Sequence, residues 1–118
     1  MSEKRIESIE ALQALLRGFA AERDWDQFHT PKNLAMALGA EAGELLEVFQ
    51  WLPESEAEKP SPDVKKAAER EMADVFIYLA RLADRLEVDL LEAAEAKMEE
   101  NARRYPADEV RGSSKKRD

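Results

Sequence analysis

The sequence lacks cysteine altogether and contains a single histidine. The absence of thiols excludes disulfides and thiolate metal sites. With one histidine, the chain has no Glu-x-x-His pairs of the kind that hold oxygen-activating di-iron centres in helical bundles. It also has no glycine-rich phosphate-binding loop or dinucleotide fingerprint, and no nucleophilic triad can be assembled. Carboxylates are therefore the main candidates for metal ligands and catalytic groups in this chain.

Long hydrophobic runs are absent as well. No apolar stretch approaches the roughly 18 residues that a membrane-spanning helix requires, and the first residues, MSEKRIESIE, are charged and lack an apolar signal core. We therefore expect a cytoplasmic protein that does not bind membranes. The formal net charge of −8 argues against binding nucleic acid through its phosphates, although not against a small polyphosphate carried by metal ions.

The 118 residues suffice for one domain, and apolar residues recur at spacings of three and four. This pattern predicts an all-α fold, with a domain over residues 1–105 and a flexible tail over 106–118. Thr30 is a suitable N-cap and Pro31 a suitable first residue for the second helix, and Asp89 is a plausible N-cap for the fourth. The proline-punctuated segment after that helix is expected to be a loop. Four helices are predicted, over about 6–23, 31–52, 63–86 and 90–105.

Two pairs of carboxylates, each spaced by three residues, are the most informative feature of the chain. Glu41 and Glu44 lie in the second predicted helix, and Glu71 and Asp74 lie in the third. Each pair shares one helix face, and both pairs fall at matching positions beside the apolar stripes. A single pair of this kind is more often a solvated face. Two facing pairs would gather four negative charges, which a hard cation such as Mg²⁺ would stabilise.

Aromatic and polar side chains extend the same faces. Trp51 lies seven residues beyond Glu44, and Tyr78 lies seven residues beyond Glu71. Each aromatic residue alone is more typical of a core than of a ligand platform. Lys97 and Asn101 follow one face of the fourth predicted helix, where they could pack against the core or could reach a phosphate, a sugar or a base. The sequence leaves both interpretations open.

An uninterrupted apolar segment, residues 75–80, lies in the third predicted helix. Six consecutive residues cover every direction around a helix, so this segment should be buried on all sides. Four short helices of one chain can hardly enclose it. We therefore expect a symmetric homodimer or homotetramer with this helix at the interface.

Two segments together resemble a known family: FAAERDWDQFHTPKNLAMALGAEAGELLEVFQW (Phe19–Trp51) and EMADVFIYL (Glu71–Leu79). They are similar to the MazG-like all-α nucleoside triphosphate pyrophosphohydrolases, and most similar to the dCTP pyrophosphatase branch. The resemblance covers roughly residues 5–105 and implies an oligomeric, four-helix-bundle-like MazG fold. It implies that the ExxE and ExxD carboxylates bind Mg²⁺. The family's substrate-contacting or motif positions fall on Trp25, His29, Asn33, Trp51, Tyr78, Lys97 and Asn101.

The implied reaction is hydrolysis of a nucleoside triphosphate to the monophosphate and pyrophosphate. Metal ions bridging carboxylates and phosphates can orient a water molecule in line with the α-phosphorus. Lys32 or Lys97 could offset part of the remaining negative charge. A carboxylate is the expected general base, and either Glu44 or Glu47, one turn further on, could serve.

The preferred substrate is expected to be dCTP or another pyrimidine deoxynucleotide, because a site sized for one ring would exclude purines. Stacking on aromatic rings tolerates any base, so polar groups such as Asn101 must provide selectivity. One alternative is the related phosphoribosyl-ATP pyrophosphohydrolase, which should carry more basic residues for its extra phosphate. The other is a non-enzymatic helical interaction module, in which the carboxylate site should be degraded, whereas all four carboxylates are present.

Overall fold

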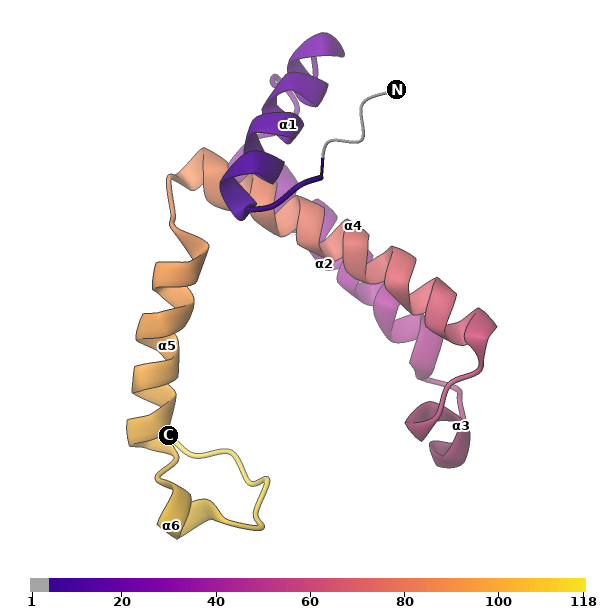
Figure 1. The fold of residues 1–118 in the computed structure, drawn as a ribbon, viewed down its shortest axis with the longest axis vertical. Coiled ribbons are helices and arrows are strands. Elements are labelled where there is room, and N and C mark those ends of the chain that lie inside the picture. The colour runs from indigo at the N-terminus through magenta and orange to yellow at the C-terminus, as the bar shows by residue number, and fades with distance from the viewer. Residues whose placement is uncertain (1–4) are drawn as a thin grey trace. The chain divides into compact units, whose positions relative to one another are not determined.

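The computed structural model describes residues 5–118, and these residues form six helices and no strand (Figure 1). The all-α prediction is therefore confirmed for this part of the chain. No helix in it is both long and apolar enough to cross a bilayer. The chain divides into two compact units, with the boundary between Glu87 and Val88. The helices are α1 (Ile9–Glu22), α2 (Pro31–Phe49), α3 (Glu54–Glu58), α4 (Pro62–Leu86), α5 (Leu90–Arg104) and α6 (Ala107–Val110).

The long helices begin at short polar residues whose side chains accept a hydrogen bond from the first helical turn. The predicted caps Thr30 and Asp89 are confirmed, since their side chains accept from the amides of Asn33 and Glu92. Ser8 and Ser61 cap α1 and α4 in the same way. These caps set where α2 and α4 begin, and those two helices carry the paired carboxylates.

The first unit is built around the contact between α2 and α4, which lie side by side with opposite chain directions (Figure 1). Leu34 of α2 and Ala68 of α4 are buried. A second face of α4 packs against α1, where Ala80 and Ala83 are buried. Gln13 Nε2 on α1 donates to the Ala80 carbonyl oxygen at 2.9 Å. Because α4 contacts both α1 and α2, its buried surface extends beyond the stripe that faces α2.

The segment after α2 differs from the prediction. Helix α2 ends at Phe49 rather than near residue 52, and the expected loop contains the short helix α3. Pro53 lies four residues beyond the end of α2, and its extended backbone suits the residue before a new helix. Glu54 and Glu56 lie in the first turn of α3, where negative charge interacts favourably with the free amides of a helix N-terminus.

The second unit contains α5, which was predicted, and α6, which lies in the expected tail. Helix α6 also follows a proline and carries acidic residues in its first turn. Residues near the C-terminus contact the end of α5, since the Arg117 backbone amide donates to the Tyr105 hydroxyl at 3.0 Å. Arg104 Nε also donates to the Arg117 carbonyl oxygen. The flexibility of residues 106–118 and the extent of the domain over 1–105 stay predictions.

Candidate functional site

Three of the four predicted metal ligands lie together at the contact between α2 and α4. Carboxylate oxygens of Glu41, Glu44 and Glu71 all lie within 4.8 Å of one another. Glu41 and Glu44 share a face of α2, because three residues are close to one helical turn. The side-by-side packing of the two helices then brings Glu71 of α4 against that face. We call these three residues the carboxylate cluster.

The interior of the carboxylate cluster is short of positive charge and of hydrogen-bond donors. Glu41 Oε2 and Glu71 Oε2 are both buried and have no hydrogen-bond partner within the described residues. Burial raises the pKa of the Glu41 carboxyl, and the nearby charges of Glu44 and Asp74 raise it further. Burial likewise raises the pKa of Glu71, and the neighbouring Glu44 and Asp74 carboxylates raise it further. Unpartnered, closely spaced carboxylate oxygens are the donor set that a hard divalent cation binds.

Asp74 and Glu47 flank the carboxylate cluster on opposite helices. Asp74 is exposed, one turn beyond Glu71, and it lies outside the tight group. Its charge is nevertheless among the causes that raise the pKa of Glu41 and of Glu71, so it is close to both. Glu47 is exposed on α2, one turn beyond Glu44.

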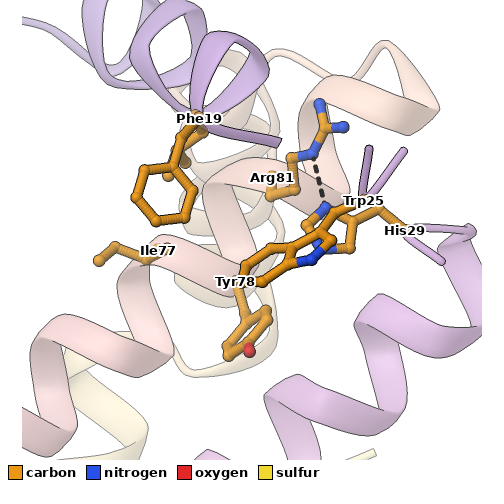
Figure 2. Close-up of a pocket in the computed structure, with 7 residues that line it drawn as sticks. Phe19, Trp25, His29, Ile77, Tyr78 and Arg81 are labelled. Atoms are coloured by element: carbon orange, nitrogen blue, oxygen red, sulfur yellow. Dashed lines mark hydrogen bonds between the residues drawn. The ribbon is translucent and has the colours of Figure 1, made fainter. Parts of the chain in front are cut away.

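An apolar pocket of about 120 Å³ lies where α1, the loop after it and α4 meet (Figure 2). Three of the predicted substrate contacts, Trp25, His29 and Tyr78, line this pocket together. The Trp25 ring meets the Phe19 ring edge-on, with centroids 5.8 Å apart. The complete lining consists of Leu16, Phe19, Trp25, His29, Ile77, Tyr78 and Arg81.

The loop that carries Trp25 and His29 is held by side-chain hydrogen bonds. Asn33 Nδ2 donates to the Phe28 carbonyl oxygen at 3.0 Å. Asn33, predicted as a substrate contact, therefore supports the loop from the start of α2. Arg85 Nη1 donates to the His29 carbonyl oxygen at 2.9 Å and ties the other side of the loop to α4.

Arg81 is a pocket residue that the sequence analysis missed. Its side chain is only 5% exposed, and its guanidinium contacts three groups. Nε donates to His29 Nδ1 at 3.3 Å, and Nη2 pairs with Asp26 Oδ1 at 2.8 Å. Nη1 lies 3.5 Å from Asp84 Oδ2. The sequence does contain one indication of this role, because Arg81 directly follows the apolar segment 75–80. A charge buried there is costly unless it is paired.

Two further predicted contacts in the first unit, Trp51 and Lys32, do not line this pocket. Trp51 follows α2 and is 85% exposed. Because α2 and α4 run in opposite directions, Trp51 and Tyr78 lie on opposite sides of the carboxylate cluster along the helix pair. Lys32 is exposed near the start of α2. Lys97 and Asn101 belong to α5 in the second unit, where Lys97 Nζ pairs with Glu100 Oε2 at 3.2 Å.

Comparison with known proteins identifies the family. The model of the MazG-like family matches residues 36–118. The chain belongs to the MazG-like family. A solved relative agrees with this assignment, since the crystal structure of a pyrophosphatase from Archaeoglobus fulgidus superposes on this MazG-like chain with a TM-score of 0.76. The two are 42% identical, and the match covers 90% of this chain and 99% of the archaeal one. The predicted MazG fold is thereby confirmed.

Curated relatives of this MazG-like chain include two mammalian enzymes. dCTP pyrophosphatase 1 from Bos taurus is 49% identical over 115 residues, and its counterpart from Homo sapiens is 49% identical over 111 residues. The matches cover 96% and 92% of this chain. They cover 66% and 65% of the relatives, so the chain spans slightly less than two thirds of their length.

Proposed function

We propose that this MazG-like protein is a Mg²⁺-dependent nucleoside triphosphate pyrophosphohydrolase. Its substrate would be dCTP or a modified pyrimidine deoxynucleoside triphosphate, and its products the monophosphate and pyrophosphate. The observation that carries the proposal is the carboxylate cluster, with two buried oxygens that lack partners. The mammalian and archaeal pyrophosphatases that resemble the chain support the same reaction. Such an enzyme would serve to remove surplus or non-standard nucleotides.

The spacing of the two sites suits a nucleotide. Glu71 and Tyr78 are seven residues apart on α4, which corresponds to roughly 10 Å along the helix axis. A nucleotide spanning that distance can place its triphosphate at the carboxylate cluster and its base in the apolar pocket. Trp25 and Tyr78 would then offer ring faces to the base.

The donor set fits Mg²⁺, because every side chain in it offers carboxylate oxygen and none offers nitrogen or sulfur. Glu41, Glu44, Glu71 and Asp74 would hold the metal. Bound Mg²⁺ supplies positive charge that offsets and orients the triphosphate oxygens. Lys32 and Lys97 are proposed to offset the charge that remains, and Asn101 to contact the sugar or the base.

A carboxylate of the chain would accept the proton of the attacking water. A water oxygen bonds to the α-phosphorus, the bond from that phosphorus to the bridging oxygen breaks, and pyrophosphate departs. The water proton passes to a carboxylate, either Glu44 or Glu47. Glu44→Gln should abolish both turnover and Mg²⁺-dependent stabilisation, because Glu44 belongs to the carboxylate cluster. Glu47→Gln separates the two roles, since a pure general base would lose turnover and keep the stabilisation.

The size of the pocket favours a pyrimidine. A cavity of about 120 Å³ is small for two fused rings, and its lining is mainly apolar and aromatic. Trp51 is proposed as a further stacking surface. Because it lies beyond the opposite end of α2, it would reach the base only if another element or a second copy of the chain brings it there.

Pyrophosphate release across a panel of nucleotides tests the proposed function. The panel should contain dCTP, 5-methyl-dCTP, dTTP, dATP, dGTP and phosphoribosyl-ATP. We expect the pyrimidine deoxynucleotides to give the highest kcat/KM, with monophosphate and pyrophosphate formed in equal amounts. Preference for phosphoribosyl-ATP would instead favour the alternative enzyme. The absence of turnover for every compound would favour a helical interaction module.

A further inference from the structure

The two ring nitrogens of His29, the only histidine in the chain, have different surroundings. Arg81 Nε donates to His29 Nδ1 at 3.3 Å. A dashed line in Figure 2 marks this hydrogen bond. The other nitrogen, Nε2, makes no hydrogen bond with any described residue, and the ring lines the apolar pocket.

The chemistry of arginine decides where the His29 proton resides. A guanidinium donates hydrogen bonds and accepts none, so His29 Nδ1 must be the acceptor. A ring nitrogen that accepts carries no proton, and the proton of the neutral imidazole is then on Nε2. Burial, followed by the positive charge of Arg81, lowers the pKa of His29, so the ring is neutral at physiological pH.

We infer that Arg81 is a positioning residue that fixes His29 in the Nε2–H tautomer, so that the pocket offers a hydrogen-bond donor to the substrate base. The matching ligand chemistry is an acceptor on a pyrimidine edge, either the ring nitrogen N3 or the carbonyl oxygen O2. This role depends on the proposed function, whereas the tautomer itself does not. His29 adds a directional polar group to a pocket whose stacking surfaces tolerate any base.

The hydrogen-bond network distinguishes this role from simple loop anchoring. Arg85 already holds the His29 backbone through its carbonyl oxygen. Asp84 pairs with Arg17 at 2.7 Å independently of Arg81. The loop and α1 therefore keep contacts with α4 when Arg81 is replaced. Arg81 alone makes two contacts, the ion pair with Asp26 and the hydrogen bond to the His29 ring. Arg81→Gln lacks the Nη2 atom of the first contact and keeps a donor for the second, so it separates loop anchoring from the contact with the ring.

Nitrogen NMR of the His29 ring tests the tautomer directly, because a tag-free protein gives the signals of one histidine. At neutral pH we expect wild-type protein to show a single neutral species protonated at Nε2. Arg81→Met should shift both ring nitrogens toward the averaged values of a mixture of tautomers. Arg81→Gln is the matched control of similar size, and its amide donor should preserve the Nε2–H form. Arg85→Met should preserve it as well.

Steady-state kinetics test the consequence for the substrate. Arg81→Met should raise KM for dCTP about three- to tenfold, the effect of one neutral hydrogen bond, with kcat changed less than about twofold. Arg81→Gln should restore most of the affinity. The 3-deaza analogue of dCTP lacks the N3 acceptor, and the 2-thio analogue weakens the O2 acceptor. If His29 contacts the altered atom, the analogue should bind wild type more weakly than dCTP does. The same analogue should bind Arg81→Met about as well as dCTP binds that variant.

The tautomer of His29 and its role in base recognition can be disproved separately. A charged or Nδ1-protonated His29 in wild type, or an unchanged tautomer in Arg81→Met, would overturn the inference outright. A shifted tautomer with unchanged KM would overturn the role in base recognition. If the protein hydrolyses no nucleotide at all, the proposed function fails while the NMR result still decides the tautomer.

Discussion

At the residue scale, the carboxylate cluster opposes folding in the metal-free protein. Buried carboxylate oxygens without donors keep the pKa of Glu41 and of Glu71 above the usual range. A carboxyl whose pKa is raised by folding favours the folded state below its unfolded pKa, and this contribution is lost as the pH rises through the folded pKa. Stability in the absence of metal should therefore fall as the pH rises from about 4.5 toward neutrality.

Replacing Glu41 with glutamine tests whether the carboxylate cluster destabilises the metal-free protein. The neutral amide removes one of the repelling charges, so the metal-free variant should unfold at a higher temperature than wild type at neutral pH. The wild type should gain stability when Mg²⁺ is added, whereas the variant should gain little. Thermal melts with Mg²⁺ or with chelator measure both effects. Glu99→Gln, at an exposed carboxylate on α5, is the control and should resemble wild type.

The carboxylate cluster was predictable because its geometry follows from helix periodicity. Two pairs at spacings of three, at matching positions on two helices that pack side by side, bring their carboxylates together. The pocket was predictable only in part, since Tyr78 was singled out by its spacing after Glu71, whereas Trp25 came from the family resemblance. Arg81 was not predicted, because its importance depends on contacts with Asp26 and His29, which lie more than 50 residues away in the chain.

At the element scale, the loop between α1 and α2 matters most for substrate binding. It places Trp25 against Phe19 and over the pocket. Trp25→Ala should raise KM for dCTP by about one to two orders of magnitude, the equivalent of one lost stacking contact, with a smaller effect on kcat. Phe28→Ala is the matched control, because Phe28 lies on the same loop, is 58% exposed and does not line the pocket. Equal KM values for the two variants would contradict the assignment of the pocket.

Helix boundaries were predictable where a cap was visible in the sequence. Thr30 with Pro31, and Asp89, set the starts of α2 and α5 as expected. The short helices α3 and α6 were missed because a proline was interpreted only as a helix terminator. Both follow a proline and carry acidic first turns, which favour a new helix start.

At the scale of the whole molecule, the single chain leaves much apolar surface uncovered. The apolar segment 75–80 was expected to be buried on all sides, yet Phe76 is 46% exposed and Ile77 is 36% exposed. Met36, Leu46 and Met72 on α2 and α4 are each about 60% exposed. We propose that a second copy of the chain covers α4, giving a homodimer or homotetramer.

Sedimentation equilibrium at micromolar concentration tests the oligomer. Wild type should sediment as a dimer or tetramer, and Phe76→Glu should weaken association by at least about tenfold, because it places a charge in an apolar interface. Ser113→Glu adds the same charge at an exposed polar position in the second unit and should leave the mass unchanged. A stable, active wild-type monomer would contradict this prediction.

The central claim is that the carboxylate cluster is the metal centre of a nucleotide pyrophosphohydrolase. Its most direct test is quantitative product analysis of dCTP incubated with wild type and with Glu41→Gln, each with Mg²⁺ and with excess chelator. Wild type with Mg²⁺ should form dCMP and pyrophosphate in equal amounts. Chelator should abolish turnover, and loss of a metal ligand should cost more than the about 10–100-fold typical of groups that only support ligands. Full turnover in chelator or in the folded variant, or release of single phosphate with dCDP, would contradict the claim.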